Sequence, residues 1–241
     1  VAVSFPRCAD DIQMARNLLL EAGSEAGIIA KIERAEAVQN LEEIIEVSDA
    51  VMVARGDLGV EIGFAELPAI QKRIISKSRY LNKAVITATQ MMESMNFNTI
   101  PTRAEVSDVA NAVLQGTDAV MLSAETASGM YPIKAVEAMA EVCLAAEREC
   151  DPQSKKKKKL ERNFNRVDEA VAMAAMYTAN HLEVKAIVAL TDTGLTPLLM
   201  SRMRSGIPVY GVSSSKLARG RMTLYRGVYP VDFDITVFAR W

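Results

Sequence analysis

Short apolar runs rich in β-branched residues alternate with longer amphipathic stretches over residues 1–149. The runs that fit strands lie at residues 1–5, 28–32, 50–54, 84–88 and 119–123. Each gap between them is long enough for a helix, and the runs are apolar on both faces, as in a parallel sheet covered by helices. The pattern therefore predicts successive βα units that form a parallel sheet.

A polar segment separates this part of the chain from a second one. Residues 150–166 include five consecutive lysines and are predicted to be a linker between domains at residues 1–149 and 167–241. Beyond the linker, three further apolar runs alternate with helix-like stretches, which predicts part of an open α/β domain. We interpret the lysine run as a solvated connector, because the chain as a whole is slightly acidic.

The number of strands in the first part leaves its architecture open. A closed (β/α)8 barrel needs eight strands and typically about 250 residues. The pattern over residues 1–149 predicts only five strands. An open parallel sheet and a barrel whose first strands lie outside this sequence are both consistent with that number.

Composition narrows the functional class. The 241 residues carry 28 Lys and Arg, 30 Asp and Glu and a formal net charge of −2, which argues against a nucleic-acid partner. The single histidine excludes a zinc site built from histidines. The three cysteines are an odd number without metal-ligand spacing, and no apolar run approaches the roughly 20 residues that span a bilayer. We therefore expect a cytoplasmic protein with no membrane partner.

Charged residues stand at the ends of two consecutive predicted strands. Lys31 and Glu33 are two positions apart, so their side chains point to the same face. The next strand runs into the segment 55–59, RGDLG, whose glycines predict a tight turn and close ligand approach. Glu33 and Asp57 would then lie at the carboxyl ends of neighbouring parallel strands. A pair of carboxylates without His or Cys suits Mg²⁺ or Mn²⁺ as the bound metal. A lysine beside such a metal adds positive charge for a transferring phosphoryl group or an enolate.

Less specific interpretations of these residues remain open. The pair of Lys31 and Glu33 also fits an ordinary ion pair at a strand end, and Asp57 also fits a cap for the following turn. The next two strands weaken both alternatives, because they again end in polar residues, with Thr89 after one and Ser123 after the other.

Five segments together resemble the pyruvate kinase family, most closely its bacterial members. They are KIERAEAV at 31–38, VMVARGDLGVEI at 51–62, VITATQMMESM at 85–95, PTRAEVSDVANAVLQGTDAVMLSAETASGMYP at 101–132 and TLYRGVYPV at 223–231. The resemblance covers nearly the whole chain except the lysine run and residues 235–241. It implies the later part of a catalytic (β/α)8 TIM barrel, about five βα units, followed by part of the C-terminal effector and assembly domain.

The resemblance implies roles for individual residues. Lys31 matches the lysine that stabilises the transferring phosphoryl group, and Glu33 and Asp57 match the divalent-metal ligands. The backbone at Gly56 and Asp57 matches the group that holds the substrate carboxylate. Thr89 matches the threonine beside the reacting enolpyruvate.

The implied reaction is phosphoryl transfer from phosphoenolpyruvate to ADP, giving pyruvate and ATP, with Mg²⁺ or Mn²⁺ and K⁺ as cofactors. Ser123 matches a polar group of the substrate pocket. The family's K⁺ ligands, its phosphate-binding arginine and its lid domain belong to segments that we do not find in this sequence. The resemblance also implies a homotetrameric parent enzyme. Because these segments are missing, we expect negligible activity of this chain alone.

A loop in the second part resembles the family's effector-phosphate loop. It contains Thr191, Thr193, Gly194 and Thr196, and hydroxyls with a glycine before a helix suit an anion such as a sugar phosphate or a nucleotide. An ordinary strand-to-helix turn capped by Thr193 is the alternative.

Two other functions compete with this interpretation. A metal-dependent pyruvate or enolate aldolase on a similar barrel would share the paired carboxylates at strand ends. A non-catalytic fragment that serves binding or assembly would share the fold without the reaction.

Overall fold

The computed structural model describes residues 1–149, 166–182, 184–203 and 205–233. Contacts within the chain divide it into two units, Val1–Glu149 and Cys150–Trp241. The predicted linker lies outside the described residues except for its last position, as do residues 234–241.

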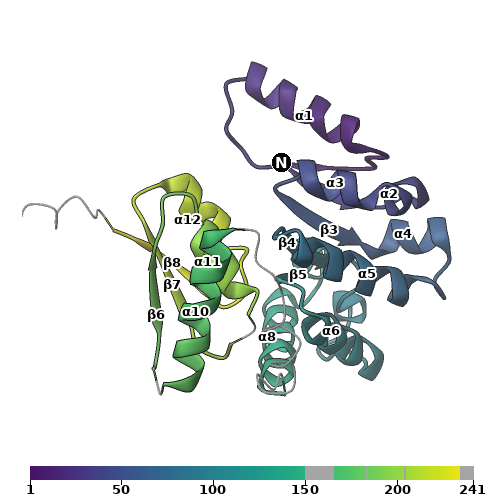
Figure 1. Cartoon of the computed structure of the whole chain (residues 1–241). Coiled ribbons are helices and arrows are strands. Elements are labelled where there is room, and N and C mark those ends of the chain that lie inside the picture. Colours follow the sequence, from purple (N-terminus) through teal and green to yellow (C-terminus); the bar gives the residue numbers. More distant parts are fainter. Residues whose placement is uncertain (150–165, 183, 204, 234–241) are drawn as a thin grey trace, which may run out of the picture. The chain divides into compact units, whose positions relative to one another are not determined.

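The first unit is a parallel sheet whose strands alternate with helices along the chain (Figure 1). Within residues 1–149 the sheet has five parallel strands in the order β1-β2-β3-β4-β5. The strands are β1 (Ala2–Val3), β2 (Ile29–Ile32), β3 (Ala50–Ala54), β4 (Ala84–Ala88) and β5 (Ala119–Met121). The helices are α1 (Ala9–Glu21), α2 (Ala35–Gln39), α3 (Leu41–Val47), α4 (Arg55–Ile62), α5 (Leu67–Tyr80), η1 (Glu93–Asn96), α6 (Arg103–Gln115), α7 (Ala124–Ala127) and α8 (Pro132–Arg148). The predicted parallel sheet is confirmed.

β2 begins one residue later than predicted, whereas β1 and β5 end two residues early, and the backbone explains these two early ends. Phe5 has φ 56°, so the chain leaves the extended conformation soon after β1. Ser123 has φ −123° and ψ −98°, which takes it out of the extended region beyond β5. At both exits the backbone amide turns to a carboxylate side chain instead of a strand partner, Phe5 to Glu33 and Ser123 to Glu125.

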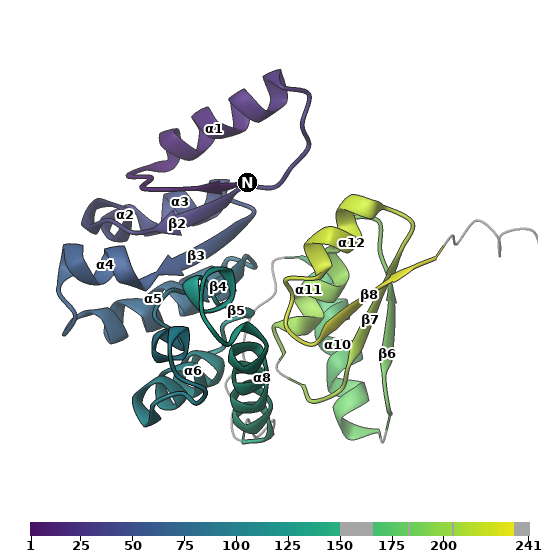
Figure 2. The same ribbon diagram turned by 180° about the vertical axis from the view of Figure 1, so that it is seen from behind.

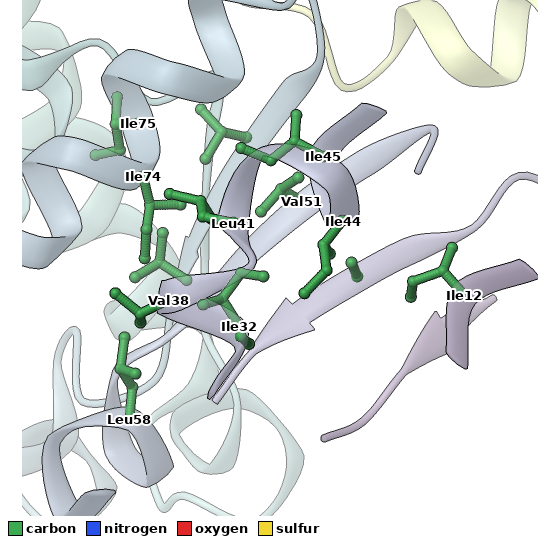
Figure 3. Packing of buried hydrophobic residues seen from close by; sticks show 14 of the residues in the cluster. Ile12, Ile32, Val38, Leu41, Ile44, Ile45, Val51, Leu58, Ile74 and Ile75 are labelled. Carbon is green, nitrogen blue, oxygen red and sulfur yellow. The ribbon is translucent and has the colours of Figure 1, made fainter. Parts of the chain in front are cut away.

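Side chains alternate along the strands, so the two faces of the sheet have different neighbours. Ile32, Val51 and Val85 pack with the helices in one hydrophobic cluster, where Ile44 and Ile74 are fully buried (Figure 3). The opposite face carries the other half of each strand, and there Lys31 pairs in register with Met52, which pairs with Ile86. Lys31 is thus a charged residue between apolar neighbours on this face.

The predicted tight turn at residues 55–59 is wrong, because this segment is the first part of α4. Leu58 is fully buried in the hydrophobic cluster, so the helix has an apolar anchor despite its glycines. A Cβ added at Gly59 would lie 2.7 Å from the Phe64 ring, so this glycine serves packing rather than ligand approach.

The second unit is a smaller parallel sheet covered on one face. Its described elements are α10 (Val167–His181), β6 (Ile187–Leu190), α11 (Leu195–Ser201), β7 (Val209–Ser213), α12 (Lys216–Met222) and β8 (Val228–Asp232). The order is β6-β7-β8, all parallel, and Figures 1 and 2 show the three helices on the same side of the sheet. Met176, Met200 and Met222, one from each helix, pack in the core cluster.

No helix in the described parts of the chain is both long enough and apolar enough to cross a bilayer.

Candidate active site

The carboxyl ends of β2 to β5 lie along one edge of the first sheet. The strands are parallel and paired in sequence order, with Ile32 opposite Val53 and Ala54 opposite Ala88. Polar residues after each strand therefore come to the same edge. They are Lys31 and Glu33 from β2, Gly56 and Asp57 after β3, Thr89 after β4 and Ser123 after β5.

Lys31 and Glu33 form an ion pair at the end of β2. The Lys31 Nζ lies 2.6 Å from Glu33 Oε1 and donates a hydrogen bond to Ser4 Oγ at 2.9 Å. Glu33 is fully buried, and its Oε2 accepts a hydrogen bond from the Phe5 amide at 2.7 Å. The predicted same-face placement is confirmed, and the contact is also the ion pair considered as an alternative. Ser4 and Phe5 were predicted as strand residues but not as part of the site, although the serine within the apolar run 1–5 was a signal.

The first turn of α4 contacts the residue that follows β4. The Gly56 amide donates to Thr89 Oγ1 at 2.8 Å, and the Thr89 hydroxyl donates to the Ala88 carbonyl at 2.7 Å. Asp57 follows in the same turn with an exposed side chain, where helix amides lack intrahelical acceptors and favour anions. Thr89 and Gln90 have φ 65° and 52°, a conformation that costs about 1–3 kcal/mol per non-glycine residue.

Arg55 holds this strained turn, and its role was not predicted from sequence. The side chain is buried, and its Nε and Nη2 donate to the Thr89 carbonyl at 3.1 and 2.8 Å. Nη2 also donates to the Gln90 carbonyl at 2.7 Å, while Nη1 pairs with Asp108 of α6. The only sequence signal was an arginine placed directly between a fully apolar strand and a buried helix.

Glu125 joins the ends of β4 and β5. Its buried carboxylate accepts hydrogen bonds from the Met92 amide at 3.1 Å and the Ser123 amide at 2.8 Å. Met92 and its fully buried neighbours Met91 and Met95 pack against α6 and α8. The segment after Thr89 is thus fixed from both sides, and Ser123 is placed at the strand end where sequence predicted it.

The donor set for a metal is small. Among the residues that the structure describes, no three His, Cys, Asp or Glu side chains are grouped to hold a metal ion. Glu33 Oε1 is buried and makes no hydrogen bond to the described chain, although Lys31 Nζ is close to it. A buried carboxylate oxygen of this kind, together with Asp57 in the first turn of α4, fits Mg²⁺ or Mn²⁺, which use few protein carboxylates and complete their shell with water or substrate oxygens.

The candidate effector loop belongs to the second unit. Gly194 has φ 85° and its amide donates to Thr191 Oγ1 at 3.0 Å, while the Leu195 amide donates to Thr193 Oγ1 at 3.4 Å. Thr196 lies in α11, directly after Leu195. Two of the predicted hydroxyls therefore satisfy backbone amides of their own loop.

A parallel βα sheet with a lysine and carboxylates along its carboxyl edge is typical of α/β enzyme domains, either barrels or open sheets. A family model described as "Pyruvate kinase, barrel domain" matches residues 1–136, and one described as "Pyruvate kinase, alpha/beta domain" matches residues 169–240. The chain belongs to the pyruvate kinase family. The first unit is accordingly part of a barrel rather than an open sheet.

Individual relatives agree with this assignment. The chain is 58% identical over 238 residues to "Pyruvate kinase II" of Salmonella typhimurium, covering 97% of this chain and 49% of the relative. It is 44% identical over 253 residues to "Pyruvate kinase 1" of Saccharomyces cerevisiae, covering all of this chain and 49% of the relative. A crystal structure of a pyruvate kinase from Cryptosporidium parvum matches with a TM-score of 0.93 and 38% identity, over 97% of this chain and 49% of that one. The chain thus spans about half the length of the relatives it matches.

Proposed function

We propose that this chain carries the metal-binding and enolpyruvate-binding part of a pyruvate kinase, which transfers a phosphoryl group from phosphoenolpyruvate to ADP. The observation that supports this most is the contact of Lys31 with the buried carboxylate of Glu33, 2.6 Å apart, at the edge that also receives the α4 N-terminus. Family membership favours this reaction over the aldolase alternative. The reaction belongs to glycolysis, which is a cytoplasmic pathway.

In this proposal Glu33 and Asp57 hold one divalent cation. Bound there, the cation would neutralise charge on the substrate oxygens during transfer. Ser4 Oγ and the Glu33 carboxylate both hold the Lys31 ammonium, so its charge is oriented before substrate arrives. The Lys31 ammonium stabilises the phosphoryl group as it leaves the enolpyruvate oxygen and the enolate that remains, which is then protonated at carbon.

The substrate carboxylate binds at the start of α4. The amides of Gly56 and Asp57 lie in its first turn, and that end of a helix attracts anions. The Gly56 amide donates to Thr89 Oγ1, so the substrate carboxylate would share this donor with Thr89. Thr89 Oγ1, 2.8 Å from the Gly56 amide, borders the same position and places a hydroxyl beside the reacting enolpyruvate. Ser123 supplies a further polar group at the end of β5.

The remaining features are proposed on the family resemblance. They are ADP and ATP binding, K⁺ dependence, homotetramer assembly, and a sugar-phosphate or nucleotide effector at Thr191, Thr193, Gly194 and Thr196. The hydroxyl contacts of the loop with its own amides make the capped turn an equal alternative to the effector site.

The proposal is tested by metal binding to this chain. Mn²⁺ should broaden NMR signals of residues at the carboxyl ends of β2 and β3, and phosphoenolpyruvate should strengthen the effect. Glu33→Gln and Asp57→Asn should abolish the site, while Glu61→Gln, an exposed position one turn further along α4, should not. Unchanged Mn²⁺ binding in both of the first two variants contradicts the metal assignment. Intact Mn²⁺ binding without any effect of phosphoenolpyruvate would favour a non-catalytic binding role.

A further inference from the structure

The guanidinium of Arg55 is unusual in that most of its hydrogen bonds go to backbone carbonyls of another strand end. It is 3% exposed, and three of its contacts are to the carbonyls of Thr89 and Gln90, at 2.7 to 3.1 Å. Its fourth contact is the ion pair with Asp108. A planar fork with five donors can satisfy all these acceptors at once, which a lysine ammonium cannot do with the same geometry.

The carbonyls that Arg55 binds belong to residues in an unfavourable backbone conformation. Both Thr89 and Gln90 have positive φ, which is uncommon outside glycine, is rarer still for a β-branched residue such as Thr89, and persists only where the surroundings impose it. The same conformation directs Thr89 Oγ1 to the Gly56 amide. Arg55 and Gly56 are adjacent in sequence. The Arg55 side chain binds the Thr89 and Gln90 carbonyls, and the Gly56 amide binds the Thr89 hydroxyl, so residues 55–56 contact this turn twice.

We propose that Arg55 is a positioning residue: by binding the Thr89 and Gln90 carbonyls it imposes the strained turn that places the Thr89 hydroxyl against the start of α4. This inference rests on the proposed function only for the meaning of Thr89 and Gly56 as substrate-binding groups. Asp108 acts behind Arg55, because the ion pair sets the rotation of the guanidinium toward the two carbonyls.

The test is NMR spectroscopy of the isotope-labelled 241-residue chain, which requires no turnover. In Arg55→Met, the carbonyl carbon resonance of Thr89 should move, and amide exchange at Gly56 should accelerate about tenfold, as expected for loss of one hydrogen bond. Arg55→Lys should show the same changes, because the charge alone does not restore the bonds to two carbonyls. Arg79→Met is the matched control, since Arg79 also donates to a carbonyl, that of Gly116 at 3.0 Å. It should leave Gly56 and Thr89 unchanged.

A merely structural role gives a different result. In that case Arg55→Met lowers the urea midpoint of unfolding, but the Gly56 and Thr89 signals of the folded chain stay at their wild-type positions, and the proposal is overturned. If neither Arg55 variant folds, the wild-type protein decides. A slowly exchanging Arg55 Nε–H with scalar coupling to the Thr89 carbonyl supports the proposal, and a rapidly exchanging one overturns it.

Thr89→Val separates cause from consequence. It removes the hydroxyl contacted by Gly56, so Gly56 exchange should accelerate while the Arg55 Nε–H remains protected. Loss of protection at Arg55 in this variant would reverse the proposed order and contradict the inference. Because no arm uses Mn²⁺ or substrate, failure here leaves the metal assignment at Glu33 standing, and failure of the metal assignment leaves these outcomes unaffected.

Discussion

Replacing Lys31 by methionine should destabilise the first unit far more than a typical lysine substitution. The ammonium lies 2.6 Å from a carboxylate that is fully buried, so its loss leaves the Glu33 carboxyl group buried without its cationic partner. Lys77 provides a matched control, because its ammonium also lies 2.6 Å from a glutamate, Glu42. The two lysine side chains are similarly exposed, 26% and 30%, but the Glu42 side chain is 57% exposed.

The magnitude follows from that difference in burial. Removing one partner of a buried pair costs about 3–5 kcal/mol, and water reaching the partly exposed Lys31 position, together with the remaining Phe5 amide, places the effect near the lower limit of about 3 kcal/mol. An exposed pair such as Lys77–Glu42 is worth about 1 kcal/mol or less. Lys31→Met combined with Glu33→Gln should recover most of the loss, because the glutamine oxygen still accepts from Phe5 and no buried charge remains.

The measurement is urea unfolding of the four proteins followed by pulsed hydrogen exchange and mass spectrometry, which reports the first unit separately from the second. Peptides that cover β2 and β3 give the free energy of unfolding of the unit. Equal destabilisation by Lys31→Met and Lys77→Met would refute the argument from burial. So would a double variant that is less stable than Lys31→Met alone.

Three further predictions concern activity and pH. In a full-length protein that contains this sequence, Lys31→Met should lower kcat by about 100- to 1000-fold with little change in the KM for phosphoenolpyruvate, since the Lys31 charge matters most in the transition state. Turnover within about twofold of the parent would contradict a catalytic role of Lys31. Glu105→Gln should destabilise the chain at pH 7, and the difference in free energy of unfolding should shrink as pH falls below 4.5. Burial raises the pKa of the Glu105 carboxyl, but hydrogen bonds from Ser94 and Thr102 outweigh burial and lower the pKa. A pH-independent difference in the free energy of urea unfolding between the two proteins would contradict this. The 241-residue polypeptide assayed alone should form ADP-dependent pyruvate no faster than a buffer control, and a rate near that of a full-length relative would show that this expectation is wrong.

The sheet could be predicted because its strands are apolar on both faces and separated by helix-length segments. Residues 50–54 and 84–88 were located without error, since every position in them is buried and the pattern has sharp ends. The turn expected at residues 55–59 failed because two glycines were given more weight than Leu58, whose burial holds a helix there. Local glycine content was overridden by packing.

The part of the candidate site that could be predicted consists of side chains whose residue type itself indicates a role. A lysine and two carboxylates at strand ends are visible in sequence, whereas the partners of Arg55 are not. Its acceptors are carbonyls 34 and 35 residues away and a carboxylate 53 residues away, and a main-chain acceptor leaves no residue-type signal. Contacts of this kind become visible only when the register of β3 and β4 is known.

The charged groups buried at this edge of the sheet differ in whether their polar atoms all have hydrogen-bond partners. Arg55 donates through Nε and both terminal nitrogens, and Glu125 accepts through both carboxylate oxygens, so each holds backbone in place. Glu33 is equally buried, but among the described residues its Oε1 finds no hydrogen-bond donor, although the Lys31 ammonium lies close to it. An unsatisfied oxygen on a buried charge is costly unless a ligand completes it. We therefore expect a ligand such as a divalent cation to bind at the end of β2, beside the backbone that Arg55 and Glu125 hold in place at the ends of β4 and β5.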